Sequence, residues 1–175
     1  MDHSPAASDA MAPASQPVPA GYADALGNWP SAVTLLTIAD GRDDIGTTVS
    51  AFSPVSADPP LVLVSLMAES YPAEVLGRLT TFAVTLLGAS QRVLAGRFAA
   101  AGRPSARLLL AEVPHRRGSR TGALIPEGGL AAFECEVSTR VPAGDHVLFI
   151  ARVTAVPYVA ESGDPLIRVR GGYLR

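Results

Sequence analysis

The 175-residue chain contains no lysine, so all 14 of its basic side chains are arginines. Without lysine it cannot form a pyridoxal Schiff base or a Walker A phosphate-binding loop. Its one cysteine, Cys135, excludes an internal disulfide. With only His3, His115 and His146 besides, a zinc site of the usual kind cannot be assembled. We therefore expect no metal, and we infer that any chemistry depends on an organic cofactor.

Strong charge and long apolar runs are also missing. The formal net charge is −2, so no global field favours nucleic acid or an anionic membrane. The apolar runs, such as 61–64, 66–68 and 147–151, are short, far below the roughly 20 residues of a membrane-spanning helix. The N-terminus lacks the charged and apolar regions of a secretion signal. We expect a cytoplasmic protein that binds neither nucleic acid nor membrane, and the apolar content of 48% indicates a large core and a buried oligomer interface.

The composition divides the chain into a tail and one domain. Residues 1–20 are rich in alanine, proline and serine, which predicts a disordered tail, and residues 21–175 fit a single domain. The patterns predict short helices over 22–28, 72–78 and 91–100, and strands over 33–38, 45–50, 61–67, 81–87, 131–138, 146–156 and 165–170, the last closing the sheet. Segment 103–122 has no regular pattern. Many strands with few short helices predict a mainly β fold, a closed or nearly closed barrel in place of a doubly wound sheet.

Three stretches of the sequence are similar to motifs of one known family. Residues 46–60 read GTTVSAFSPVSADPP, residues 82–87 read FAVTLL and precede Gln91, Leu94 and the run 97–99, and residues 143–150 read AGDHVLFI. Together with Gly171, Gly172 and Tyr173, they resemble the short-chain flavin reductase family over roughly residues 22–175. Pro54 and Thr85 depart from the family motifs, which usually have serine and asparagine there. The resemblance implies an FMN-binding split β-barrel with Greek-key-like connections and a few short helices.

The resemblance also implies an activity. Members of the family are NAD(P)H:flavin oxidoreductases, and we expect hydride transfer from NADH to FAD or FMN, with the reduced flavin passing to a partner monooxygenase, in a setting such as bacterial antibiotic biosynthesis. A homodimer is expected, because barrels of this size complete their flavin site across a two-fold interface. Direct hydride transfer needs orientation and no catalytic triad. The alternatives are a pyridoxamine-phosphate-oxidase-like enzyme on the same barrel and a non-enzymatic flavin-binding protein.

The resemblance places the flavin ring along the hydroxyl-rich stretch that begins at Gly46. Hydroxyl groups and backbone there can supply donors and acceptors to the ring edge. His146 is assigned to the nicotinamide side, where it orients the cofactor. The residues assigned to cofactor binding are Trp29, Pro30, Ser31, Thr47, Thr48, Val49, Ser50, Ala51, Phe52, Ser53, Ser65, Glu69, Ser70, Tyr71, Arg97, Phe98, Gly171 and Tyr173.

One departure affects the flavin phosphate. Many relatives have an arginine where this chain has Ala68, and Glu69 adds a charge of the wrong sign. The phosphate then depends on Ser70 and the backbone amides of the following helix, or on an arginine that reaches in. The candidates for that arginine are Arg78, Arg97 and Arg103.

Simpler interpretations stand beside these assignments. The run 47–56 can be a polar turn, His146 can satisfy a turn, and Trp29 can be a buried aromatic residue. Cys135 lies on the apolar face of its strand, which favours a core position over a redox role. The group Arg116, Arg117 and Arg120 is typical of a solvated loop, with docking of cofactor phosphates or of the oxygenase as the alternative.

Overall fold

The computed structural model describes residues 17–41 and 43–174. Of the expected disordered tail, residues 1–16 lie outside the described residues, and residues 17–20 are exposed. The first element is the short helix α1 (Tyr22–Gly27), as the sequence predicts. Within the described residues, no helix has the length and apolar character needed to cross a membrane.

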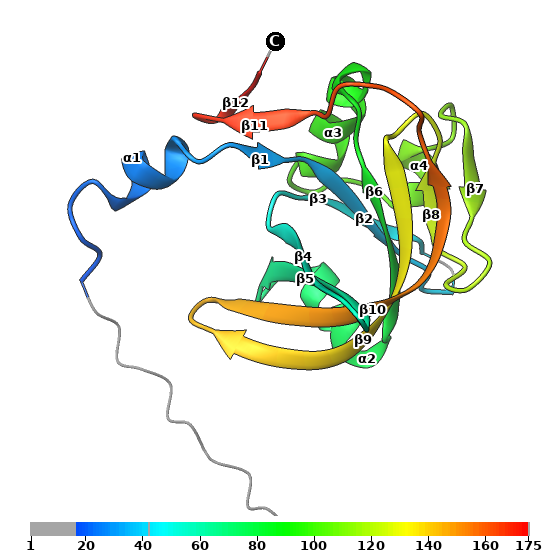
Figure 1. Ribbon diagram of the computed structural model, residues 1–175, viewed down its shortest axis with the longest axis horizontal. Coiled ribbons are helices and arrows are strands. Elements are labelled where there is room, and N and C mark those ends of the chain that lie inside the picture. Colours follow the sequence, from blue (N-terminus) through cyan, green and yellow to red (C-terminus); the bar gives the residue numbers. More distant parts are fainter. Residues whose placement is uncertain (1–16, 42, 175) are drawn as a thin grey trace, which may run out of the picture.

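Seven strands form one antiparallel sheet that curls around a core (Figure 1). Their order across the sheet is β3-β2-β6-β9-β10-β5-β4. In the order of the chain they are β2 (Thr34–Ile38), β3 (Ile45–Val49), β4 (Phe52–Ala57), β5 (Pro60–Met67), β6 (Thr81–Leu86), β9 (Ala131–Ala143) and β10 (His146–Val159). The edge strands β3 and β4 follow each other in the chain but do not pair. The sheet is therefore split along this seam, and the predicted mainly β class is confirmed.

Shorter elements complete the fold around this sheet. Strands β1 (Ser31–Ala32), β11 (Ile167–Val169) and β12 (Gly172–Tyr173) form a second small sheet, and β7 (His115–Arg117) pairs with β8 (Leu124–Pro126). The helical segments are α2 (Tyr71–Arg78), η1 (Ala89–Gln91), α3 (Arg92–Ala99) and α4 (Ala106–Leu109). In Figure 1 the small sheet and the long β9–β10 arm lie on opposite sides of β3, β4 and β5.

Apolar side chains fill both faces of the β2–β3 region. Leu36, Phe82 and Phe149 belong to the core inside the curled sheet, and Leu35 and Phe98 belong to a second core beneath α3 and α4. Strand β2 is buried at all five positions, which is why its sequence is an unbroken β-rich run. The core position expected for Cys135 is confirmed, because the side chain is fully buried and burial raises the pKa of the thiol to about 12.

The elements differ from the expectations at four places. Residues 52–57, for which no strand was predicted, form edge strand β4, and their mostly exposed positions show no apolar alternation. Strand β9 continues to Ala143 because its exposed end pairs with β10. The irregular segment 103–122 contains α4 and β7, both too short to show a period. Strand β11 pairs with β1 and β12 and does not close the main sheet.

Candidate functional site

Strand β3 presents hydroxyl groups along an open edge of the sheet. It pairs with β2 on one side, and its other edge faces the seam. Thr47 and Thr48 are half-buried and Ser50 is exposed. Among the described residues, Thr47 Oγ1 makes a single long contact of 3.5 Å, to the carbonyl oxygen of Thr48. These groups therefore remain free to bond a ligand, and the interpretation of 47–56 as a closed polar turn does not hold.

A cavity of about 320 Å³, which we call the hydroxyl pocket, opens beside this strand. It is lined by Thr47, Thr48, Val49, Ser50, Ala51, Ser65, Leu66, Met67, Ser70, Pro72, Arg103 and His146. Pairing of β5 with β10 sets Met67 opposite His146, and the amide of Ser65 donates to the carbonyl oxygen of Ala51 at 3.0 Å. Eight of the residues assigned from the sequence therefore share one cavity, although they come from three separate stretches of the chain.

His146 is held at the mouth of this pocket by its neighbour. Its Nδ1 lies 2.7 Å from Oδ1 of Asp145, and this hydrogen bond lowers the pKa of the Asp145 carboxyl group. The carbonyl oxygen of Asp145 accepts from the amide of Ala68 at 2.9 Å, which ties the β9–β10 turn to the end of β5. With Nδ1 donating to the carboxylate, Nε2 is the nitrogen left for a ligand.

A second cavity, the tail pocket, shares the hydroxyls of β3 and has a volume of about 480 Å³. Arg92, Arg168 and Tyr173 line it together with Thr47, Thr48, Ser50, Val33, Ala99, Gly171 and Gly172. The guanidinium carbon of Arg92 lies 5.3 Å from the centre of the Tyr173 ring. Because the two pockets share Thr47 and Thr48 of β3 and the following Ser50, ligands in both would lie close together.

Trp29 lies in a third, adjoining cavity. The side chain is 74% exposed, so its interpretation as a buried aromatic residue is wrong. The cavity has a volume of about 290 Å³, and Trp29 lines it together with Ser31, Ser50, Arg168 and Gly171 among others. Its ring is thus available to cover a ligand that extends from the tail pocket.

Several assigned residues lie outside these cavities. Phe98 is fully buried beneath β3, where its ring would lie 2.4 Å from a Cβ placed on Gly46. Phe98 therefore packs under the site instead of contacting a ligand, which corrects its assignment, and position 46 must be glycine. The Phe52 ring stacks on Phe133 with the ring centres 5.9 Å apart. The remaining residues, Pro30, Ser53, Glu69 and Arg97, are exposed and line none of the three cavities.

A fourth cavity adjoins the hydroxyl pocket at Arg103. This loop pocket has a volume of about 390 Å³, and its walls are residues 43–46, 71–72 and 102–105. Pro72 and Arg103 line both cavities, and Tyr71 lines the loop pocket. Of the three candidate arginines, Arg78 is paired with Asp40 and Arg97 is exposed, so that only Arg103 reaches the hydroxyl pocket.

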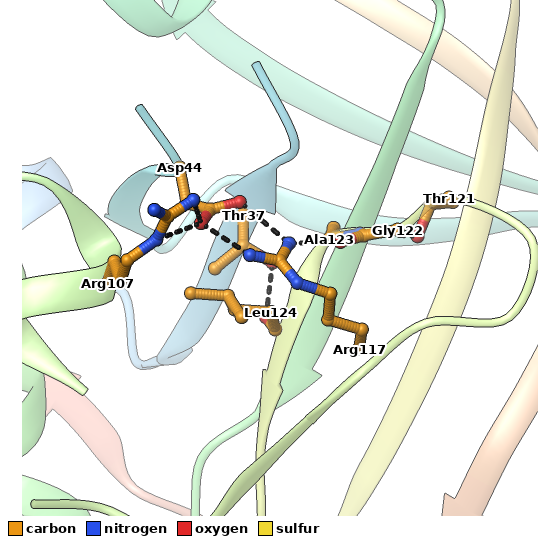
Figure 2. Close-up of polar contacts among 8 residues, drawn as sticks. All are labelled: Thr37, Asp44, Arg107, Arg117, Thr121, Gly122, Ala123 and Leu124. Atoms are coloured by element: carbon orange, nitrogen blue, oxygen red, sulfur yellow. Dashed lines mark hydrogen bonds and ion pairs between the residues drawn. The ribbon is translucent and has the colours of Figure 1, made fainter. Parts of the chain in front are cut away.

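The loop pocket is supported by the buried carboxylate of Asp44 (Figure 2). Arg107 and Arg117 donate to it over 2.9–3.1 Å, and the Asp44 carbonyl oxygen accepts from the amide of Ala106. Burial alone would raise the pKa of Asp44, but the hydrogen bonds from Arg117 and Arg107 outweigh it and hold the pKa below its usual value. Sequence reasoning missed this cluster, and it assigned Arg117 to a solvated loop.

Glu134 on β9 is a second buried carboxylate. Its oxygens accept from the backbone amides of Ser119, Arg120 and Thr121 and from the hydroxyls of Ser119 and Thr121. Burial would raise its pKa, but these bonds, led by those from Thr121, lower it. Glu134 lines none of the cavities around β3, so its role is to fix the 118–122 loop.

The chain is similar to known flavin reductases. A family model described as a flavin reductase-like domain matches residues 26–175. The chain is 35% identical over 152 residues to an NADH-dependent FMN reductase of Streptomyces nodosus subsp. asukaensis, covering 85% of this chain and 80% of the relative. It is 30% identical over 154 residues to the reductase component of a 4-hydroxyphenylacetate 3-monooxygenase of Thermus thermophilus, covering 88% and 94%.

A solved structure extends this likeness to the fold. An NADH:FAD oxidoreductase of Streptomyces globisporus, solved with NAD and FAD fragments, superposes with a TM-score of 0.79 at 28% identity, covering 86% of this chain and 88% of that chain. The fold class and the family resemblance predicted from the sequence are both confirmed.

Proposed function

Because the chain belongs to the flavin reductase-like domain family, we propose that it is an NADH-dependent flavin reductase that binds FAD or FMN and passes reduced flavin to a partner monooxygenase. The observation that carries this proposal is the hydroxyl pocket, in which the unpaired hydroxyls of β3 meet Ser65, Ser70 and His146. The named activities of the relatives support the choice of NADH and of FMN or FAD. When bound, the flavin supplies an acceptor for hydride from the nicotinamide.

The residues of the pocket bind and orient the two reactants. Thr47, Thr48 and Ser50 offer hydroxyls, and the free edge of β3 offers backbone groups, to the polar rim of a planar ring. The tail pocket, which also contains Thr47, Thr48 and Ser50, holds the remainder of NADH, and the nicotinamide reaches the hydroxyl pocket, where His146 lies. His146 contacts the reactants through Nε2, while Asp145 fixes its ring. No side chain needs to move a proton, so the rate depends on how closely the two rings are positioned.

The protein works as a homodimer in this proposal. Large apolar side chains are exposed around the seam, with exposed fractions of 51% for Val55, 60% for Met67 and 52% for Tyr71. A self-complementary interface would cover such side chains and close the mouth of the hydroxyl pocket. The monooxygenase partner is inferred from the relative that is itself a reductase component. We place the reaction in the cytoplasm, where NADH is available, and in a pathway such as bacterial antibiotic biosynthesis.

An anaerobic mixing experiment tests the activity. Purified protein, NADH and either FAD or FMN should bleach the oxidised-flavin absorbance at about 450 nm, faster than the same mixture without protein. NADPH in place of NADH should give a slower rate. Absence of bleaching with both flavins and both nicotinamide cofactors would contradict a reductase and favour the non-enzymatic flavin-binding alternative.

A further inference from the structure

The end of β5 and the start of α2 lack a basic side chain. Ala68 and Glu69 occupy the turn, and both are exposed. The hydroxyl of Ser70 is already used to cap the helix, because it accepts from the amide of Ala73 at 3.4 Å. An anionic group that leaves the hydroxyl pocket along Ser70 and Pro72 therefore needs a cation from another part of the chain.

Arg103 is the basic side chain at that place. It is half-buried, and it lines the hydroxyl pocket as well as the loop pocket. Its Nε donates to the carbonyl oxygen of Gly46 at 2.7 Å, and one terminal nitrogen donates to the carbonyl oxygen of Ala100 at 3.3 Å. Two backbone anchors thus hold the guanidinium at the junction of the two cavities.

The charge of Arg103 has no counter-charge within the described residues. Arg78, Arg107 and Arg117 each form an ion pair with a carboxylate, whereas Arg103 forms none. The side chain is half-buried, and this burial lowers the pKa of Arg103. Two aspartates line the loop pocket; Asp44 is neutralised by its two arginines, and Asp43 is exposed. A partly desolvated cation without a carboxylate partner favours an anionic ligand.

We propose that Arg103 binds the phosphate of the flavin, in place of the arginine absent at position 68. With the ring in the hydroxyl pocket, the ribityl chain leads past Ser70 and Pro72 to the junction where the guanidinium lies. The loop pocket beyond Arg103 receives the adenylate half when the flavin is FAD. This proposal rests on the proposed function, because it takes the hydroxyl pocket as the flavin site.

Riboflavin separates phosphate binding from ring binding, because it shares the ring and ribityl chain of FMN and lacks the phosphate. Dissociation constants of FMN and riboflavin are measured by flavin fluorescence for the unchanged protein, for Arg103→Gln and for Arg103→Lys. The expected result for Arg103→Gln is a loss of about 10- to 100-fold in FMN affinity, the range of a charged hydrogen bond, with riboflavin changed less than about twofold. Arg103→Lys keeps the charge and should retain most of the FMN affinity.

Arg78→Gln is the matched control, since it removes an arginine that is paired with Asp40 at the surface. It should leave both affinities unchanged. An equal loss for FMN and riboflavin in Arg103→Gln would overturn the proposal and reduce Arg103 to a support for the Gly46 backbone, and no loss for either would overturn it as well. Failure of the proposed function is distinguished by a different result, the absence of NADH-dependent bleaching by the unchanged protein.

Discussion

Thr34 and Thr37 on β2 and Thr47 and Thr48 on β3 lie on paired strands, but their hydroxyls differ in what they bond. Thr34 Oγ1 donates to the carbonyl oxygen of Val49 at 2.8 Å, and Thr37 Oγ1 donates to that of Leu124 at 2.6 Å. On β3, the hydroxyl of Thr47 makes one long contact to its neighbour, and both threonines line cavities. The inner strand β2 uses its polar groups to stabilise the fold, whereas the edge strand β3 leaves them available for the ligand that the proposed function requires.

The charged groups show the same division. Asp44 and Glu134 are each at most 2% exposed, and each is surrounded by donors. Arg103, at the cavities, bonds only backbone carbonyls within the described residues. Every buried side-chain nitrogen and oxygen of the described residues has a hydrogen-bond partner. Substitutions of the buried carboxylates should therefore change stability, and substitutions of the polar groups that line the cavities should change ligand binding or rate.

Glu134→Gln should have the largest effect on stability. The amide nitrogen of glutamine would face the backbone donors of residues 119–121, leaving buried polar groups without partners. We expect a loss of about 3 kcal/mol in the free energy of unfolding, measured by urea denaturation, with flavin affinity unchanged. The control Glu136→Gln removes an exposed pair with Arg152 and should change the free energy by less than about 0.5 kcal/mol. A similarly small change for Glu134→Gln would contradict the role of Glu134 in fixing the 118–122 loop.

Asp44→Asn should have the next largest effect, about 2 kcal/mol at pH 7. Because the folded pKa of Asp44 lies below its unfolded value, the carboxylate stabilises the fold above the unfolded value of about 3.9. This stabilisation is lost as the pH falls through the folded pKa. Urea denaturation at pH 7 and pH 3 should therefore show a difference between the two proteins that narrows in acid. A difference that stays constant with pH would show that the lost charge is not its cause.

His146→Ala should slow hydride transfer about tenfold, equivalent to about 1.4 kcal/mol in the barrier, with flavin affinity within about twofold. The reason is that Nε2 orients the nicotinamide and the flavin ring is held by β3. Stopped-flow bleaching at saturating NADH measures the step directly. Asp145→Asn, which loosens the ring through its hydrogen bond, should show a smaller decrease. An unchanged rate in His146→Ala would remove it from the site.

The fold was largely predictable where burial gives the sequence a pattern. Strands β2 and β6 are almost wholly buried, and their apolar runs mark them directly. Edge strand β4 is mostly exposed, and its conformation depends on pairing with β5, which no local pattern reveals. The same holds for α4, a short helix whose first amide donates to the carbonyl oxygen of Asp44, the residue before β3.

The site was predictable for the residues that share a motif, and less so for those brought in by the fold. Thr47 to Ala51 lie in one quoted run and meet in one pocket. The partners of Asp44 lie 63 and 73 residues further along the chain, so no spacing connects them. Arg103 was one of three candidates in the sequence. The pairing of Arg78 with Asp40, the exposure of Arg97 and the position of Arg103 at two cavities distinguish it from the others, and none of these can be read from the sequence.

The comparison of β2 with β3 is tested most directly by one substitution on each strand. Thr34→Val removes a buried hydroxyl that bonds Val49 and should lower the free energy of unfolding by about 1 kcal/mol, with flavin affinity unchanged. Thr48→Val removes a hydroxyl that faces two cavities and should weaken flavin binding about three- to tenfold, with the free energy of unfolding within about 0.5 kcal/mol. Urea denaturation and flavin titration of both variants give four values. If Thr48→Val changes stability as much as Thr34→Val and leaves flavin affinity intact, the β3 hydroxyls serve the fold, and the ring must bind elsewhere.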